Sequence, residues 1–423
     1  MDESSFRNPK LRDARLVAYK AFADGAGKGS VFLITVVAAR RLSPEAFGIF
    51  SLASTLGWML AVATDVGIQL HVAREVSRMP ARAADILAAW LRVRLWTTAA
   101  AIALVMLGLI ATEATLAFAL SLLLFAIVYG GSGLIEFLNY FYRGLSRSDI
   151  ESTLTLWQRS ATLVFGIVAL LWRPDVAVLA LAILIPVTTT LLISVRIATG
   201  LANPQCAPAE GQYEIDDESF VKDVLPIGAG IVLSALYFRI DVFLVQWWNG
   251  TEAVALYNAV FRIVEALRLF PAAVLAVALP ALCTASDLRP VMRVATGVLL
   301  FAFAAAAVLW LTADWTIPLL YGEKYAEAVP AFRILLLSFP LLSLNYALTH
   351  QLIGWNNQRA YAALCGVALV INIALNARLL PAMSIDGAAW ATLGTELCLT
   401  FGCVLALATR GARTMAATAG LPV

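Results

Sequence analysis

The sequence predicts an all-α integral membrane protein with about twelve transmembrane helices, in two six-helix lobes around a central cavity. Hydrophobic residues make up 61% of the 423 residues and charged residues only 14%, whereas soluble domains carry about 25% charged residues. The mean hydropathy is +0.83. Apolar stretches long enough to cross a bilayer recur along the whole chain, and one polar linker interrupts them near its midpoint.

Twelve stretches approach the roughly 20 mostly apolar residues that a helix needs to cross a bilayer. The connections between them are short, so no loop is large enough to fold as a separate domain. The expected spans are 18–39, 47–70, 87–110, 114–141, 152–172, 176–198, 220–246, 254–281, 290–313, 328–351, 360–380 and 385–409.

Polar and charged side chains lie inside several of the first six spans. Glycines at 25, 27 and 29 predict irregular backbone in span one, beside a water-filled cavity. Three charges of span one are spaced four residues apart, which suits ion pairs along a helix. The polar residues of the first half are Lys20, Asp24 and Lys28 in span one, Asp65 at the end of span two, Ser132, Glu136, Asn139 and Arg143 on one face of span four, and Arg159 in span five.

Span seven contains the segment LYFRIDVFLV, in which Arg239 and Asp241 interrupt an apolar run. Two residues apart, they are separated by about 200° around a helix, so we expect each to find its partner on a different neighbouring helix. Span eight is the obvious supplier, because four of its polar residues fall within about 120° of arc. Those residues are Asn258, Arg262, Glu265 and Arg268.

The last spans also carry polar side chains, and Pro271 should kink span eight. The residues are Arg333 and Asn345 in span ten, Asn372 and Asn376 one turn apart in span eleven, and Glu396 in span twelve. One interpretation is that such groups join helices or extend from span ends to the membrane surface. The other is that they line a hydrated passage, because charges at membrane depth are costly and usually functional.

Basic residues in the connections predict the orientation of the chain. Sixteen lysines and arginines fall on the side of the N-terminus and five on the opposite side. Because basic residues concentrate in cytoplasmic connections, both termini should be cytoplasmic.

The chain should divide into an N-terminal lobe, residues 1–200, a cytoplasmic linker, 201–219, and a C-terminal lobe, 220–423. The linker, LANPQCAPAEGQYEIDDES, contains proline and acidic residues. The segments SPEAFGIFSLA and GTEAVALYNAV open spans two and eight at an offset of 207 residues. This similarity favours a duplicated six-helix unit, with a substrate site between the halves.

Several functions lack support in the sequence. The five cysteines form no CxxC pair and the two histidines lie far apart, so we expect no metal site and no cofactor. The GAGKGS segment at 25–30 lacks the spacing of a phosphate-binding loop, and its lysine precedes glycine. A net charge of +2 gives no reason to expect nucleic acid. The N-terminus is polar and basic without a cleavable signal, so the first span should be retained.

Four segments resemble the Wzx-type polysaccharide repeat-unit flippases of the multidrug/oligosaccharidyl-lipid/polysaccharide exporter superfamily. They are AARRLSPEAFGIFSLA, LYFRIDVFLVQWWNGTEAVALYNAVFRIVEALRLFPAAVLAVALPAL, YGEKYAEAVPAFRILLLSFPLLSLN and VINIALNARLLPAMSIDGAAWATLGTE. The motifs are degenerate, but their order covers about residues 17–409.

The resemblance implies a non-enzymatic protein that moves undecaprenyl-diphosphate-linked oligosaccharide to the outer leaflet of the bacterial inner membrane. Arginine suits phosphate through its bidentate fork. The expected substrate-binding residues are Lys28, Arg239, Arg262, Arg268, Asn258, Glu136, Asn139, Asn345, Asn372 and Asn376. Carboxylates expected to hold these cations in place, or to exchange a proton or sodium ion, are Asp24, Asp65, Asp241, Glu265 and Glu396.

The expected partners are membrane lipid, the lipid-linked substrate, and the polysaccharide polymerase with its chain-length machinery. Two alternatives remain open. A cation-coupled multidrug antiporter belongs to the same superfamily, although its cationic ligands would favour a cavity without arginines. A membrane glycosyltransferase or polymerase usually presents a large outer loop, whereas the outer loops here are short. The sequence does not identify the glycan.

Overall fold

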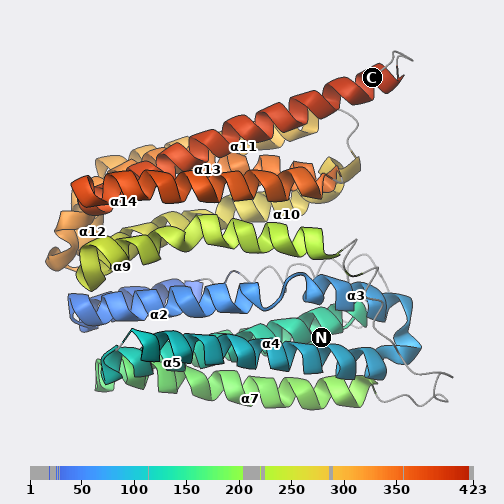
Figure 1. Cartoon of the computed structure of the whole chain (residues 1–423), viewed down its shortest axis with the longest axis horizontal. Helices are drawn as coiled ribbons and strands as arrows, with labels where there is room; N and C mark the ends of the chain where they lie inside the picture. Colours follow the sequence, from blue (N-terminus) through green and yellow to red (C-terminus); the bar gives the residue numbers. More distant parts are fainter. Residues whose placement is uncertain are drawn as a thin grey trace, which may run out of the picture. The chain divides into compact units, whose positions relative to one another are not determined.

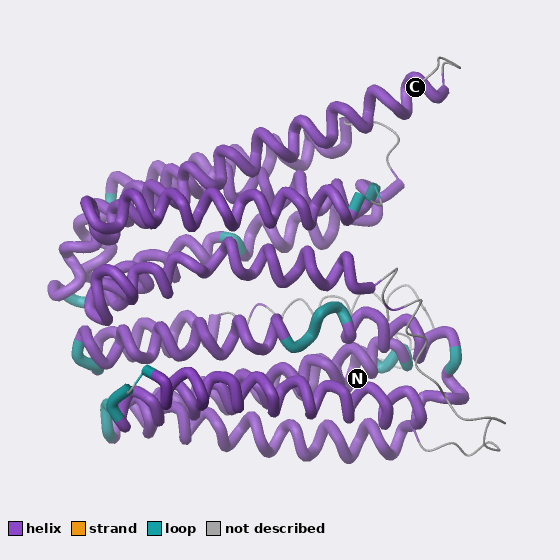
Figure 2. The backbone as a smooth tube through the Cα atoms, viewed as in Figure 1, coloured by secondary structure: helices purple, strands orange, loops and turns teal. Residues whose placement is uncertain are grey.

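The computed structural model describes residues 19, 25, 27, 29–112, 114–202, 220, 224–284, 289–355 and 357–418. Within these residues all regular secondary structure is helical, as Figure 2 shows. The chain separates into two compact units, Met1–Gly228 and Ala229–Val423.

The N-terminal unit begins with a helix over residues 29–41. Ser43 caps the helix that follows, because its hydroxyl accepts a hydrogen bond from the Ala46 amide at 3.2 Å. The remaining helices of this unit are α2 (Pro44–Ala63), α3 (Ile68–Arg78), the short η2 (Pro80–Arg82), α4 (Ala83–Ala111), α5 (Leu116–Gly144), α6 (Ser148–Trp172) and α7 (Val176–Ala202) (Figure 1).

The C-terminal unit contains two long helices that each bend back on themselves. Gly250 interrupts the first and Ser384 the second, both with positive φ. The elements are α9 (Leu225–Leu267), α10 (Leu269–Thr284), α11 (Arg289–Leu311), α12 (Ala313–Tyr321), η4 (Glu323–Ala328), α13 (Val329–Gly354) and α14 (Gln358–Thr418) (Figure 1). We call residues 225–249 and 251–267 the first and second arms of α9.

The all-α membrane fold is confirmed. Among the described residues, nine helical stretches are long and apolar enough to cross a membrane. Two of them contain the interruptions at Gly250 and Ser384 and therefore supply two spans each. The helix at 29–41 overlaps the expected span one, so twelve helical segments overlap the twelve expected spans.

Two details differ from the expected spans. Span two was expected to run without a break over 47–70, but α2 ends at Ala63 and α3 begins at Ile68. Val66 and Gly67 have φ values of 41° and 85°, which no helix accommodates. The nine-residue α12 was not expected, because it is too short to cross a bilayer. The kink near Pro271 is confirmed, since the helix breaks at Arg268, where α9 gives way to α10.

Each unit is organised around one central helix. In the N-terminal unit α5 contacts α2, α3, α4, α6 and α7, and in the C-terminal unit α13 contacts α10, α11, α12 and α14. The N-terminal core includes Phe137, Phe141 and Trp90. Large apolar side chains such as Trp96 and Leu300 remain exposed, as expected for helices whose outer surface faces lipid.

Candidate functional site

The two arms of α9 lie side by side and join their polar residues. The buried guanidinium of Arg239 donates a hydrogen bond from Nη2 to Asn258 Oδ1 and stacks 4.6 Å from the ring centre of Phe261. The Tyr257 hydroxyl donates to Asp241 Oδ2. Arg239 and Asp241 thus both take partners from span eight, the helix expected to supply them, and not each from a different neighbour.

A buried polar network extends from this pair into α14. Tyr257 Oη lies 3.2 Å from Thr392 Oγ1. Farther along, Asn345 on α13 donates to Glu396 Oε2 at 2.7 Å and to the Glu396 carbonyl oxygen at 2.9 Å. Thr400 donates to Asn345 Oδ1 at 2.8 Å. Buried polar groups therefore connect α9, α13 and α14.

Asparagines on the first half of α14 join the same network. Asn372 donates to Thr395 Oγ1 at 3.3 Å, and Asn376 donates to Asn372 Oδ1 at 2.9 Å. Asn372 and Thr395 help to line a cavity of about 10 Å³, which is close to the space that one water molecule needs. The cavity is lined by Tyr237, Phe238, Asp241, Asn372, Thr392, Thr395 and Glu396.

The second arm of α9 carries the more accessible charges. Arg262 Nη1 lies 2.7 Å from Glu265 Oε2, and their side chains are 17% and 36% exposed. The half-buried Arg268 stacks over Phe238 at 4.2 Å. Glu265 interacts electrostatically with Arg262, with Arg268 and with the buried Arg239. Arg262 is therefore the ion-pair partner of this partly exposed carboxylate, and Arg268 and Arg239 add positive charge that acts on it.

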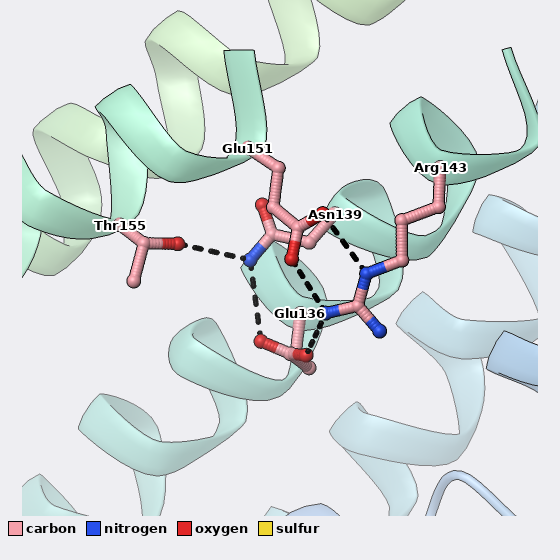
Figure 3. A network of polar contacts seen from close by, with 5 residues as sticks. All are labelled: Glu136, Asn139, Arg143, Glu151 and Thr155. Atoms are coloured by element: carbon pink, nitrogen blue, oxygen red, sulfur yellow. Dashed lines mark hydrogen bonds and ion pairs between the residues drawn. The ribbon is translucent and has the colours of Figure 1, made fainter. Parts of the chain in front are cut away.

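The N-terminal unit contains a second polar network, at the junction of α5 and α6. Figure 3 shows Arg143 between two carboxylates: it contacts both oxygens of Glu151 and lies 3.4 Å from Glu136 Oε1. Asn139 donates to Glu136 Oε2 at 3.2 Å and contacts Thr155 Oγ1 at 3.5 Å. The two residues predicted here, Glu136 and Asn139, are thus in direct contact.

Asp65 occupies the break between α2 and α3. Its carboxylate accepts hydrogen bonds from the amides of Gly67 at 3.3 Å and Gln69 at 3.1 Å, which stabilises the start of α3. Its electrostatic partner is Arg94 on α4, a residue that the sequence analysis did not select. Arg94 is fully buried and donates one long bond, at 3.4 Å, to the Gly133 carbonyl.

Two of the predicted residues, Lys28 and Asp24, lie outside the described residues. Arg333 forms an ion pair with Asp314 and lies over Trp310, which fits the interpretation of a span-end contact. Within the described part of the chain, no group of three or more His, Cys, Asp or Glu residues could hold a metal ion. The roles assigned to the predicted residues remain predictions.

Comparison with solved structures identifies the fold. Over 94% of this chain and 96% of the other, it matches an outward-facing multidrug resistance transporter of the MATE family with a TM-score of 0.68 at 15% identity. A superfamily transporter from Pyrococcus furiosus, described as having a binding pocket of reversed polarity, matches with a TM-score of 0.66 at 14% identity. That match covers 95% of this chain and 96% of the other. These similarities concern the fold alone.

Family models place the sequence more closely. The model described as "polysaccharide biosynthesis protein" matches residues 15–286, more than half of the chain, and the MatE model matches residues 226–377. No curated protein matches the sequence. The chain belongs to the polysaccharide biosynthesis protein family and is a multi-pass membrane transporter of the multidrug/oligosaccharidyl-lipid/polysaccharide exporter superfamily.

Proposed function

We propose that the protein moves an undecaprenyl-diphosphate-linked oligosaccharide from the cytoplasmic to the outer leaflet of the bacterial inner membrane, by alternating access. Both termini would be cytoplasmic, and the oligosaccharide would then pass to a polymerase. The observation that carries the proposal is the partly exposed Arg262, 2.7 Å from Glu265, with Arg268 as a second cation that acts on the same carboxylate. A diphosphate is the part of such a substrate that arginines bind best.

The arginines divide into two roles by their exposure. Arg239 is only 2% exposed and holds Asn258, so it orders the two arms of α9 in this conformation. Arg262 and Arg268 are more accessible and share Glu265, giving a local charge of +1 from two cations and one carboxylate. We assign phosphate contact to Arg262 and Arg268.

The buried network of the C-terminal unit supports a coupling role. Asp241 and Glu396 contribute carboxylates to a small cavity that is otherwise lined by hydroxyl, amide and aromatic groups. Such oxygen groups could bind a coupling ion, either a proton or a sodium ion. The asparagines 345, 372 and 376 would then order these carboxylates.

The alternative is a cation-coupled multidrug antiporter. The MATE transporters that match in structure favour it. A cationic drug requires carboxylates and aromatic rings that are not shared with arginines. Here the partly exposed carboxylate of Glu265, on the second arm of α9, is paired with Arg262, which favours an anionic ligand.

The test is a deletion strain in which the lipid-linked oligosaccharide is labelled. An impermeant glycan-cleaving reagent is applied to intact and to opened spheroplasts. Flippase activity predicts that repeat units accumulate and are cleaved only after the membrane is opened. Normal cleavage from outside, or no accumulation, would redirect attention to drug efflux or polymerisation.

Complementation of the deletion strain then tests the site. Arg262→Ala and Arg268→Ala should each fail to restore outer-leaflet accessibility while reaching the membrane in normal amounts. Arg333→Ala is the matched control, because it removes an arginine of the same unit whose ion-pair partner, Asp314, is 71% exposed. Restoration by Arg262→Ala and Arg268→Ala would contradict phosphate contact at these residues.

A further inference from the structure

The boundary between the two compact units falls inside a helix. It lies between Gly228 and Ala229, within the first two turns of α9, which begins at Leu225. The polar linker expected at 201–219 ends before this point. The first residues of α9 are therefore grouped with the N-terminal unit, and the remainder of α9 with the C-terminal unit.

Residues just before α9 pack on the N-terminal unit. The ring of Phe220 lies 5.2 Å from that of Trp90 and 5.6 Å, edge-on, from that of His71. Phe220 thereby joins the hydrophobic core formed by α3, α4, α5 and α7. Val224 is 4% exposed. The side chains of Phe220 and Val224 are therefore both packed within the N-terminal unit.

Gly228 makes the tightest contact of this segment. A Cβ atom placed on Gly228 would lie 2.2 Å from the carbonyl oxygen of Val66, closer than any side chain allows. On the opposite side, a Cβ on Gly67 would lie 2.9 Å from Val224 Cγ1. The start of α9 and the break between α2 and α3 therefore fit together with no space for a side chain on either glycine.

The break that receives Gly228 has a defined shape. Gly67 has a φ of 85°, a conformation that favours glycine. Asp65 holds the turn by accepting the amides of Gly67 and Gln69. The surface that meets α9 is thus fixed by hydrogen bonds within the N-terminal unit.

Two residues later, α9 makes another close contact, within the C-terminal unit. A Cβ on Gly230 would lie 2.9 Å from ring carbons of Tyr361 on α14. Only Ala229 separates this contact from that of Gly228. Gly228 therefore packs closely within the N-terminal unit and Gly230 packs closely within the C-terminal unit.

We propose that Phe220 and residues 224–228 act as a strap that moves with the N-terminal unit, and that Gly228–Ala229–Gly230 is the pivot about which the C-terminal unit turns. Glycine is a common site of helix bending, and hinges are a few residues that absorb the change in backbone angles. The strap transmits the motion because Phe220 and Val224 anchor it. This inference is independent of the substrate that the protein carries.

Spin labels test the strap without altering its contacts. Labels attached through a genetically encoded amino acid spare the native cysteines and are placed at the exposed residues Leu225, Met79 and Met292. Distances are measured by pulsed electron resonance in phospholipid nanodiscs, with and without undecaprenyl diphosphate. We expect a single Leu225–Met79 distance in both conditions, while the Leu225–Met292 pair shows more than one distance even without the lipid. A changing Leu225–Met79 distance, or a single Leu225–Met292 distance in both conditions, would overturn the proposal.

Glycine variants test the pivot itself. Gly228→Ala and Gly230→Ala should each hold the Leu225–Met292 label pair in one distance population and lower transport at least 10-fold. Gly108→Ala and Gly297→Ala are controls, because a Cβ at either position meets nothing within 4 Å. Variants at 228 and 230 that keep the wild-type distance distribution contradict the pivot. If either variant fails to insert, the wild-type label distances decide, and they do so even if the proposed substrate is wrong.

Discussion

Tyr257 shows how a single hydroxyl can stabilise a carboxylate inside a membrane protein. It donates to Asp241 and meets Thr392, whereas the equally buried Tyr321 has a hydroxyl without a hydrogen-bond partner among the described residues. Tyr257→Phe leaves an Asp241 oxygen buried without this donor, so we expect a loss of about 1–3 kcal/mol. Tyr321→Phe should change stability little.

Thermal unfolding of the purified protein in detergent measures both variants. For a unit of about 200 residues, that loss corresponds to a fall in the unfolding midpoint of roughly 2–10 °C. Equal midpoints for Tyr257→Phe and Tyr321→Phe would mean that the hydroxyl of Tyr257 does not stabilise Asp241.

The sequence made some of these residues predictable and not others. Arg239 and Asp241 stand out because they interrupt an apolar span, and their angular separation requires outside partners, which the structure supplies. Arg94 was missed because it lies two residues from Arg92 near the expected start of span three, where cations usually extend toward the membrane surface. Tyr257 was missed because a tyrosine in an apolar helix gives no sign of what its hydroxyl contacts.

At the scale of elements, one arginine ties the end of α5 to the start of α6. Arg143 binds both oxygens of Glu151, whose side chain is 4% exposed. Arg143→Lys removes the bidentate geometry, and we expect a loss of about 1–3 kcal/mol, because a buried carboxylate is left partly unsatisfied.

Arg147→Lys provides the matched control at the same junction. Arg147 also contacts both oxygens of a carboxylate, that of Asp149, but these side chains are 45% and 49% exposed. Exposed pairs contribute about 1 kcal/mol or less. The midpoint of thermal unfolding should therefore be clearly lower for Arg143→Lys than for Arg147→Lys. The reverse order would show that the burial of Glu151 does not determine the strength of its ion pair with Arg143.

Helix boundaries were predictable wherever apolar length or proline marked them. Pro271 marks the break between α9 and α10, since its ring cannot pack against the carbonyl four residues earlier in a regular helix. The break at Val66 and Gly67 has no such marker, because a single glycine inside an apolar helix is usually tolerated. Its shape depends instead on Asp65 and on the approach of Gly228, a contact between residues far apart in the sequence.

At the scale of the whole molecule, composition and packing mark the division of the chain differently. Composition identifies the polar stretch 201–219, whose residues from 203 onward lie outside those described. Packing groups the chain up to Gly228 with the N-terminal unit. The difference arises because hydropathy records only where the chain is polar, whereas Phe220 and Val224 join the N-terminal unit through apolar contacts.

The proposed cargo makes the whole molecule sensitive to the membrane potential. A diphosphate carries about two negative charges. Its movement out of a negatively charged cell interior therefore releases roughly 4–5 kcal/mol per 100 mV of membrane potential. The transport can therefore proceed without a second ion if the protein carries these charges uncompensated. We expect an interior-negative potential of about 100 mV to raise the outer-to-inner ratio of the lipid at least 100-fold.

Proteoliposomes with a valinomycin-imposed potassium potential measure this ratio through an impermeant glycan-cleaving reagent. Reversing the potential should drive the lipid inward, and vesicles without protein should show neither movement. A ratio that ignores the potential but follows a sodium or proton gradient would mean that the cargo crosses with compensating cations. Coupling would then rest on the buried carboxylates Asp241 and Glu396, and Asp241→Asn and Glu396→Gln should abolish the dependence on the gradient.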